Sequence, residues 1–324
     1  MKRYHTRIPA ALRKVRLDQF ILEWLPQAMG KPLSRTTLRT LFFSGSVYVN
    51  RHRQKKPLTE VYAGAVIEVY YDSDKVAEKG GTRLIDARVD PEWIVFEDEW
   101  LIVVNKPSGL PTQPTVDPGR ANLYDLMGKY LSGRHPSGNA YVGLHHRLDK
   151  DTSGLVLLTK KEEANKGVSQ LFAEHRIRKT YHCLCWRSPS APALEVHGGF
   201  EIKNFLGKVS ESQGKKKFGA VSSGGDFALT RYRTIQLFRD MAWLTAMPET
   251  GRTQQIRVHC SENGLPILGD SLYFPENLHP LIAVPRLLLH AASLEFEHPM
   301  TGAPVKIECA LPKEFISTLS QGKE

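Results

Sequence analysis

The sequence lacks the motifs by which most enzymes bind a coenzyme or a catalytic metal. It contains no Walker phosphate loop, no glycine fingerprint of a dinucleotide-binding fold, no H-E-x-x-H pair and no G-x-S-x-G nucleophile elbow. These absences argue against the common nucleotide-dependent, redox and zinc-hydrolase designs. We therefore expect chemistry that side chains perform alone, with no cofactor and no metal.

Cysteine is scarce, with four residues at positions 183, 185, 260 and 309. No paired C-x-x-C units are present, so the spacing does not predict a zinc site. Cys183 and Cys185 alternate within the strand-like stretch TYHCLCW and would share one strand face, which is a poor geometry for a disulfide. Reduced, mostly buried thiols in a cytoplasmic protein are expected.

Long apolar runs are missing, and none approaches the roughly 20 residues that span a bilayer. The N-terminus is basic but lacks the apolar segment of a secretory signal, so a cytoplasmic protein without a membrane span is expected. Acidic residues are few in residues 1–72, which carry 13 Lys and Arg against 5 Asp and Glu. That segment is therefore +8 of the chain's +10, which predicts an acidic polymer as partner, most simply nucleic acid or a membrane surface.

Composition divides the chain into four segments. Residues 1–14 are predicted as a basic arm, residues 15–72 as a compact unit, residues 73–90 as a polar linker with a glycine pair, and residues 91–324 as a larger domain. A length of 324 residues is enough for two such domains, each with its own core.

The compact unit is predicted to contain two helices and two strands. Apolar residues at helical spacing indicate a helix within 15–25, and a second helix is expected over 35–44. Strand-like stretches at 46–50 and 64–71 are joined by the basic connector 51–57. Phosphate contact is predicted for the cations of this unit, with a merely solvated face as the alternative: Arg35, Arg39, Arg51, Arg53, Lys55 and Lys56.

The larger domain is predicted to be α+β, with a mixed sheet and few helices. A helix is expected over 161–175, and residues 208–226 are expected to form a mobile basic loop. Strands are expected on both sides of Asp98–Glu99 and in four further stretches: 154–160, 179–186, 241–248 and 286–312.

The densest group of ionisable residues lies in GLHHRLDKDTSGLVLLTK, residues 143–160. Asp149 stands in a polar turn just before an apolar strand, where a carboxylate can be partly desolvated and held by a cation. A structural Asx-turn with ordinary ion pairs is the alternative reading. His145 and His146 do not predict a metal site, because adjacent residues of an extended segment point to opposite sides.

Five motifs cover roughly residues 91–312 in this order: VNKPSGLPT, HRLDKDTSGLVLLTK, RKTYHCLC, TGRTQQIRVHCSENGLPILGDSLY and LLLHAASLEFEHPMTG. Together they resemble one family, the RluA-type ribosomal-RNA pseudouridine synthases. Gln254 stands where that family usually has His, and Cys183 where a small residue is common. Residues 15–72 are similar to the alpha-L RNA-binding domain, although its usual Asn-Gly turn is Asn50-Arg51 here.

The resemblance implies a catalytic domain with a mixed, mainly antiparallel sheet, and it implies residue roles. Asp149 matches the catalytic aspartate, Tyr181 the tyrosine that packs on the target base, and Arg257 the arginine that pairs with the aspartate. Arg147 matches an arginine that contacts RNA near the extruded nucleotide. Arg252 is expected to contact the RNA backbone. Further candidates for substrate or RNA contact are His146, which is also expected to stabilise the loop, Asn105, Lys106 and Leu289, an apolar wall of the pocket.

The implied reaction converts uridine to pseudouridine without a cofactor, since no atom is gained or lost. Ribosomal RNA is the expected partner of a monomeric enzyme, with transfer RNA left open. Two other hypotheses compete with this one. A non-catalytic RNA-binding factor of ribosome assembly could share the fold, and a histidine- or metal-dependent phosphodiesterase could use His145, His146 and Asp149.

Overall fold

The computed structural model describes residues 2–30, 32–33, 37–38, 41–42, 46–54, 56–71, 88–115, 120–135, 138–212, 215–275 and 282–322. Contacts divide the chain into two units. The small unit comprises Met1–Arg88 with Gln113–Leu126, and the large unit comprises Val89–Thr112 with Met127–Glu324. The predicted linker 73–90 lies mostly outside the described residues, and the four predicted segment boundaries stay predictions.

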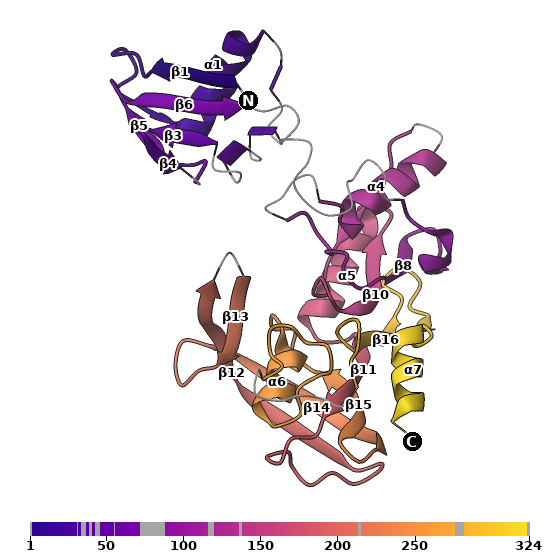
Figure 1. Ribbon diagram of the computed structural model, residues 1–324. Coiled ribbons are helices and arrows are strands. Elements are labelled where there is room, and N and C mark those ends of the chain that lie inside the picture. The colour runs from indigo at the N-terminus through magenta and orange to yellow at the C-terminus, as the bar shows by residue number, and fades with distance from the viewer. Residues whose placement is uncertain are drawn as a thin grey trace. The chain divides into compact units, whose positions relative to one another are not determined.

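The small unit contains a four-stranded sheet in the order β1-β6-β3-β4 and a separate β2–β5 pair (Figure 1). Its core is formed by apolar side chains of α1 and of the strands, among them Ile21, Leu25, Ile67 and Val69. The bounds are β1 (Lys2–Arg7), β2 (Lys14–Arg16), α1 (Leu17–Met29), β3 (Val47–Val49), β4 (His52–Gln54), β5 (Glu60–Tyr62) and β6 (Val66–Tyr71).

The helix predicted within 15–25 is confirmed as α1. Leu17, Phe20, Ile21 and Leu25 recur at three- and four-residue spacing and are buried on one face. Gly30 ends the helix in the left-handed conformation, with φ of 67°, which glycine adopts without steric cost. Of the second predicted helix, only residues 37–38 and 41–42 are described, and they are helical.

Two basic stretches of the small unit contain strands that the sequence did not predict. The predicted basic arm is a paired strand over most of its first half, because Lys2–Arg7 hydrogen-bonds antiparallel to β6. The predicted connector 51–57 contains β4, which forms a hairpin with β3. Asn50 and Arg51 make the two-residue turn with φ of 49° and 68°, the positive values that a type I′ hairpin turn requires.

The large unit contains a long sheet in the order β13-β12-β14-β15-β11-β16-β10-β8-β7, with β17 paired to β16 and β9 to β10. The β10–β16 pair is parallel, and the other pairs are antiparallel. The predicted α+β class with a mixed, mainly antiparallel sheet is confirmed. The strands are β7 (Ile94–Glu97), β8 (Leu101–Lys106), β9 (Gly143–Leu144), β10 (Ser153–Thr159), β11 (Arg178–Trp186), β12 (Gly199–Ser212), β13 (Lys215–Ala220), β14 (Asp226–Leu237), β15 (Met241–Pro248), β16 (Leu289–Glu297) and β17 (Pro304–Glu308).

Helices pack on this sheet through its alternating side chains. Cys183 and Cys185 of β11 share a core cluster with α6, whereas Leu184 between them packs with Phe315 of α7. Because successive strand residues point to opposite faces, α6 and α7 cover opposite faces of β11 (Figure 1). The helical segments are η1 (Pro91–Trp93), α4 (Leu123–Arg134), α5 (Glu163–Ala173), α6 (Gln255–Glu262) and α7 (Lys313–Gln321).

The predicted helix over 161–175 is confirmed as α5, whose buried Val168 and Leu171 pack on β8 and β10. The predicted mobile loop over 208–226 is wrong for most of its length. Residues up to 212 continue β12, and Lys215–Ala220 forms β13 in an antiparallel hairpin with it. No helix within the described ranges is long and apolar enough to cross a bilayer.

Candidate active site

The charged loop between β9 and β10 is tied to the segment that follows β8. Thr112 Oγ1 donates to Leu148 O at 2.8 Å and accepts from Leu148 N at 3.1 Å. Ser108 Oγ donates to Asp151 O at 2.6 Å, and Gly109 N donates to Lys150 O at 2.9 Å. These four bonds flank Asp149 on both sides, so they fix the backbone from which its carboxylate projects.

Lys106 adds a further tie from inside the protein. Its side chain is fully buried, and its ammonium donates to the carbonyl oxygens of Pro107, Leu110 and Lys150 at 2.8–3.1 Å. Burial lowers the pKa of Lys106 to about 7, although the charges of Asp151 and Asp149 oppose that shift. The predicted contact of Lys106 with RNA does not fit this burial, since its donors already serve the loop backbone.

Gly154 permits the close approach of the two parallel strands behind the loop. Its φ is 115°, and a Cβ there would lie 2.2–2.7 Å from backbone atoms of Ala291. A larger residue would push β10 away from β16, so glycine after the Thr-Ser pair is a requirement of packing.

The Asp149 carboxylate forms an ion pair with the guanidinium of Arg257 from α6, with Nη1 3.0 Å from Oδ2. The Asp149 side chain is 26% exposed, whereas the Arg257 side chain is 7% exposed. The carboxylate thus remains accessible beside a buried cation. The two predicted partners, 108 residues apart in sequence, are brought together.

Arg257 is itself held by Asp270, a residue that the sequence interpretation did not single out. Nε donates to Oδ2 at 2.8 Å and Nη2 to Oδ1 at 2.7 Å, and the Asp270 side chain is fully buried. Asp270 Oδ1 also accepts from the backbone N–H of Leu272 and Tyr273. The aspartate within GDSLY, next to a glycine, was the available signal, because such a carboxylate can bind the following N–H groups.

Gly269 places Asp270 correctly. Its φ is 76°, and a Cβ would lie 1.9 Å from Arg286 O. Behind the ion pair, the ring of Tyr273 lies 5.1 Å from the Arg257 guanidinium carbon, and its hydroxyl donates to Gln254 Oε1 at 2.5 Å. Gln254 therefore has a positioning contact at the start of α6.

Arg257 stays charged in this setting. Burial alone lowers its pKa, but the bonds and charge of Asp270, followed by those of Asp149, raise it above the ordinary value. Its guanidinium holds one carboxylate by two parallel bonds and still offers Nη1 to the other, a geometry that lysine cannot reproduce.

Tyr181 lies on β11, opposite Ala246 and Ala291 in the register. The pairing with β16 shifts between Thr180 and Tyr181, an irregularity of the kind that re-aims a side chain at a site. Burial, followed by the negative charge of Asp149, raises the pKa of Tyr181 above its usual value. The phenol therefore keeps its proton near neutral pH. Leu289 of β16 is 3% exposed in the core cluster against which Tyr181 packs.

One exposed arginine lies on the loop and another on the segment before α6. Arg147 Nη2 donates to Thr253 Oγ1 at 3.2 Å, and Arg252 Nε donates to Phe227 O at 2.9 Å. Each bond orients an exposed guanidinium next to the segment that carries Arg257. Asn105, half-buried on β8, lies opposite Leu155 in the register.

His146 packs inside the loop. Its Nε2 accepts from Leu157 N at 2.8 Å, and its ring stacks on Phe172 at 4.6 Å between centroids. Burial lowers the pKa of His146 to about 3, so the ring is neutral. This position agrees with the predicted role in stabilising the loop and offers little to RNA. His145 contacts Ser169, Thr159 and Asn165 instead.

The predicted basic residues of the small unit are only partly described. Arg35, Arg39 and Lys55 lie outside the described residues. Arg51 and Arg53 are exposed at the β3–β4 hairpin, and Lys56 is exposed just after it. The Arg53 guanidinium lies 5.9 Å from the centre of the Tyr48 ring.

Comparisons with known proteins point to one family. The family described as RNA pseudouridylate synthase matches residues 100–262. Ribosomal large subunit pseudouridine synthase D of Zymomonas mobilis is 37% identical over 236 residues, covering 69% of this chain and 71% of that protein. Ribosomal large subunit pseudouridine synthase C of Yersinia pestis is 32% identical over 312 residues, covering 93% of this chain and 89% of that protein.

Solved structures agree with this match. Human RNA pseudouridylate synthase domain containing 4 is 26% identical, with a TM-score of 0.54 over 72% of this chain and 93% of that chain. The predicted resemblance and activity are therefore confirmed, while the roles of individual residues stay predictions. This chain belongs to the RNA pseudouridylate synthase family and is an RNA pseudouridine synthase, an isomerase.

Proposed function

We propose that this enzyme isomerises uridine in large-subunit ribosomal RNA, with Asp149 as its catalytic carboxylate. The relatives' names support the choice of RNA. The observation that carries the residue assignment is the partly exposed Asp149 carboxylate, paired with an arginine that a buried aspartate locks in place. Residues 15–72, preceded by the basic residues 1–14, serve as the RNA-binding domain. Residues 91–324 form the catalytic domain of a monomeric, cytoplasmic enzyme.

The chemistry explains why one carboxylate suffices. The C1′–N1 glycosidic bond breaks, the uracil turns, and a C1′–C5 bond forms, so no atom is gained or lost. Asp149 can attack the ribose, add to the base or remove the C2′ proton, and every route begins from the ionised carboxylate. The role of Arg257, 3.0 Å away, is to orient the Asp149 carboxylate through a charge-assisted hydrogen bond.

Tyr181 supplies a surface for the base. Stacking of a uracil on an aromatic ring contributes about 1–3 kcal/mol, which offsets part of the few kcal/mol needed to extrude a nucleotide. Because its pKa is raised, the phenol acts at neutral pH as a hydrogen-bond donor and not as a base. Leu289 lies in the adjoining apolar cluster.

Exposed arginines supply the contacts to RNA. Arg147 stands on the catalytic loop and Arg252 on the segment before α6, and both neutralise phosphates next to the extruded nucleotide. In the small unit, Arg51, Arg53 and Lys56 are the described members of the proposed phosphate-binding set. These contacts position the RNA but do not choose the uridine.

The decisive test is Asp149→Asn, with pseudouridine mapped on a large-subunit ribosomal RNA transcript. We expect a rate loss of about 10³-fold or more, because the amide cannot serve any of the three routes, while RNA affinity remains. Asp151→Asn is the matched control, since that side chain is 44% exposed two residues away. Normal turnover by Asp149→Asn would overturn the residue assignment. Wild-type protein that binds ribosomal and transfer RNA without forming pseudouridine would favour the assembly-factor hypothesis.

A further inference from the structure

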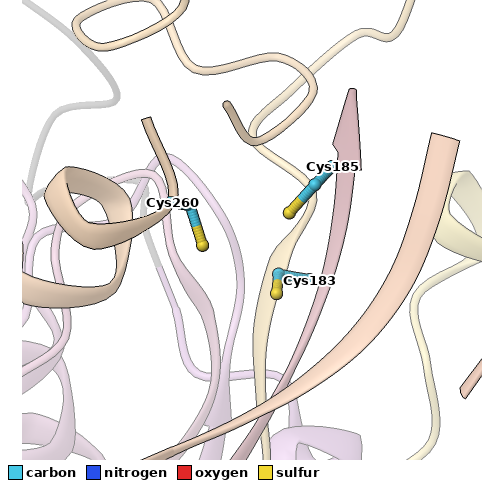
Figure 2. A group of neighbouring side chains, drawn as sticks. All are labelled: Cys183, Cys185 and Cys260. Carbon is cyan, nitrogen blue, oxygen red and sulfur yellow. The ribbon is translucent and has the colours of Figure 1, made fainter. Parts of the chain in front are cut away.

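Three cysteines that the reaction does not use meet inside the large unit. Cys183 and Cys185 come from β11 and Cys260 from α6, and their sulfur atoms lie within 4.8 Å of one another (Figure 2). We call this group the thiol triad. No other set of three His, Cys, Asp or Glu side chains converges in this way within the described ranges.

The surroundings of the thiol triad are closed and apolar. All three side chains are 0% exposed and belong to one core cluster with Leu244, Leu265 and other aliphatic residues. In such a core, valine or alanine would satisfy packing equally well. Three thiols from two different elements instead bring their sulfur atoms close together (Figure 2).

The spacing suits one metal ion. Three sulfur ligands around an ion with metal–sulfur bonds of about 2.3 Å stand about 4 Å apart. The sulfur atoms of the thiol triad lie within 4.8 Å of one another, which is close to that spacing. Soft thiolate ligands select copper(I) or zinc(II) among common cellular ions.

The only polar side chain at the thiol triad shown to contact it is Tyr232, whose hydroxyl lies 3.6 Å from Cys260 Sγ as a hydrogen-bond partner. Structural zinc sites are almost always four-coordinate, whereas these residues supply three ligands. The coordination number therefore selects copper(I).

We propose that Cys183, Cys185 and Cys260 form a three-coordinate binding site for one copper(I) ion. All three cysteines bind as thiolates, so three S–H bonds break, three copper–sulfur bonds form and three protons leave to solvent without any change of oxidation state. Cys183 gives up the proton that it donates to Leu244 O. The complex carries a net charge of −2, and the Tyr232 hydroxyl is placed to donate a hydrogen bond to Cys260 Sγ.

The site joins the two elements that carry the proposed catalytic groups. Cys183 lies two residues from Tyr181 on β11, and Cys260 lies three residues from Arg257 on α6. A bound ion therefore cross-links the strand of the stacking tyrosine to the helix of the pairing arginine. This inference does not depend on the proposed residue roles, because it rests on the thiol triad alone.

The test loads the reduced, full-length protein with copper(I) under anaerobic conditions, both in the native state and during refolding, since the site is closed. We expect one copper per chain after gel filtration, a sulfur-only first shell by X-ray absorption, three protons released per ion and an upward shift of Tm. Cys260→Ala and, independently, Cys183→Ala should lose the bound copper while keeping the circular dichroism of the wild type. Cys309→Ala is the matched control and should retain it, because Cys309 lies outside the thiol triad.

Three results would overturn the proposal. They are no copper retained by either loading route, copper retained equally by Cys260→Ala, and a first shell that contains nitrogen or oxygen. Zinc(II) retained at one per chain, with copper(I) displaced by it, would equally contradict a three-coordinate copper site. Pseudouridine formation is not a readout here, so failure of the reaction mechanism and failure of this site are separate outcomes.

Discussion

At the scale of single residues, Asp270 positions the guanidinium of Arg257. It holds Arg257 by two hydrogen bonds, while Asp149 receives one. Without Asp270, the guanidinium is free to turn its paired nitrogen atoms toward Asp149. That rearrangement would pull the Asp149 carboxylate out of the orientation set by its loop.

We predict that Asp270→Asn lowers kcat about 100-fold with little change in KM for RNA, because a misplacement near 1 Å costs that much in a positioned reaction. The amide keeps the shape and can still accept from Leu272 N and Tyr273 N, so the fold is preserved. Single-turnover kinetics on a ribosomal RNA transcript measure the effect. A variant with wild-type kcat would show that Arg257 needs no such anchor.

Lys106 is a second residue whose role is argued from its burial. Its pKa is about 7 in the folded chain and about 10.4 in an unfolded one, so the unfolded chain binds more protons between these values. The free energy of unfolding that Lys106 contributes therefore rises with pH from about 7 to about 10 and is lowest below pH 7, where the folded chain bears the ammonium.

We compare the free energies of unfolding of the wild type and of Lys106→Met. Above pH 7, we predict that the wild-type value rises relative to that of the variant by roughly 1 kcal/mol per pH unit. Other titrating groups cancel in this difference. Urea unfolding at pH 6, 7, 8 and 9 measures it, with the exposed Lys161→Met as control. A difference that stays constant with pH would mean that Lys106 is charged in the fold throughout this range.

At the scale of elements, the turn of the β3–β4 hairpin places an arginine where the backbone conformation favours glycine. Its type I′ turn requires positive φ at both central residues, and Arg51 adopts 68° where glycine would be free of strain. An arginine in that conformation costs about 1 kcal/mol. A contact between its exposed guanidinium and an RNA phosphate would offset this cost.

We predict that Arg51→Gly raises the stability of the small unit by about 1 kcal/mol and lowers RNA affinity, with the salt slope reduced by about one unit. Thermal unfolding and RNA titration at several salt concentrations measure both effects on the same protein. Arg51→Gln is the matched control, because it removes the charge and leaves the strain. Unchanged RNA affinity in both variants would remove Arg51 from the interface.

An element could be predicted from the sequence when the pattern that specifies it lies within its own residues. The α1 and α5 helices were predicted because their apolar faces repeat at helical spacing within the segment itself. The β12–β13 hairpin was missed because its strands are polar and gain their order from pairing with neighbours, including β14. β1 was missed for the same reason, since its partner β6 lies about 60 residues away.

The candidate site shows the same division. The sequence alone was enough to pair Asp149 with Arg257, because their motifs resemble those of a family. Asp270 and the convergence of Cys260 with Cys183 and Cys185 required the three-dimensional fold, because no local pattern relates α6 to β11.

At the scale of the whole molecule, charge and chemistry are separated along the chain. The candidate catalytic groups lie in the large unit, while residues 1–72 carry +8 of the net charge of +10. Cations that contact phosphate release condensed counterions, so they make binding steeply dependent on salt. Such a division predicts that RNA affinity and chemical rate respond to different parts of the protein.

We predict that deleting residues 1–72 weakens RNA binding and flattens its salt dependence, by about 0.7 to 0.9 in slope for each phosphate that is no longer neutralised. The rate from a saturating RNA complex should fall much less, because Asp149, Tyr181 and Arg257 all lie in the large unit. Filter binding between 50 and 200 mM salt and single-turnover kinetics separate the two effects, with circular dichroism as the check on folding. An unchanged salt slope would mean that the basic segment does not meet phosphate. A loss of rate at saturation equal to the loss of affinity would mean that the small unit takes part in shaping the catalytic site.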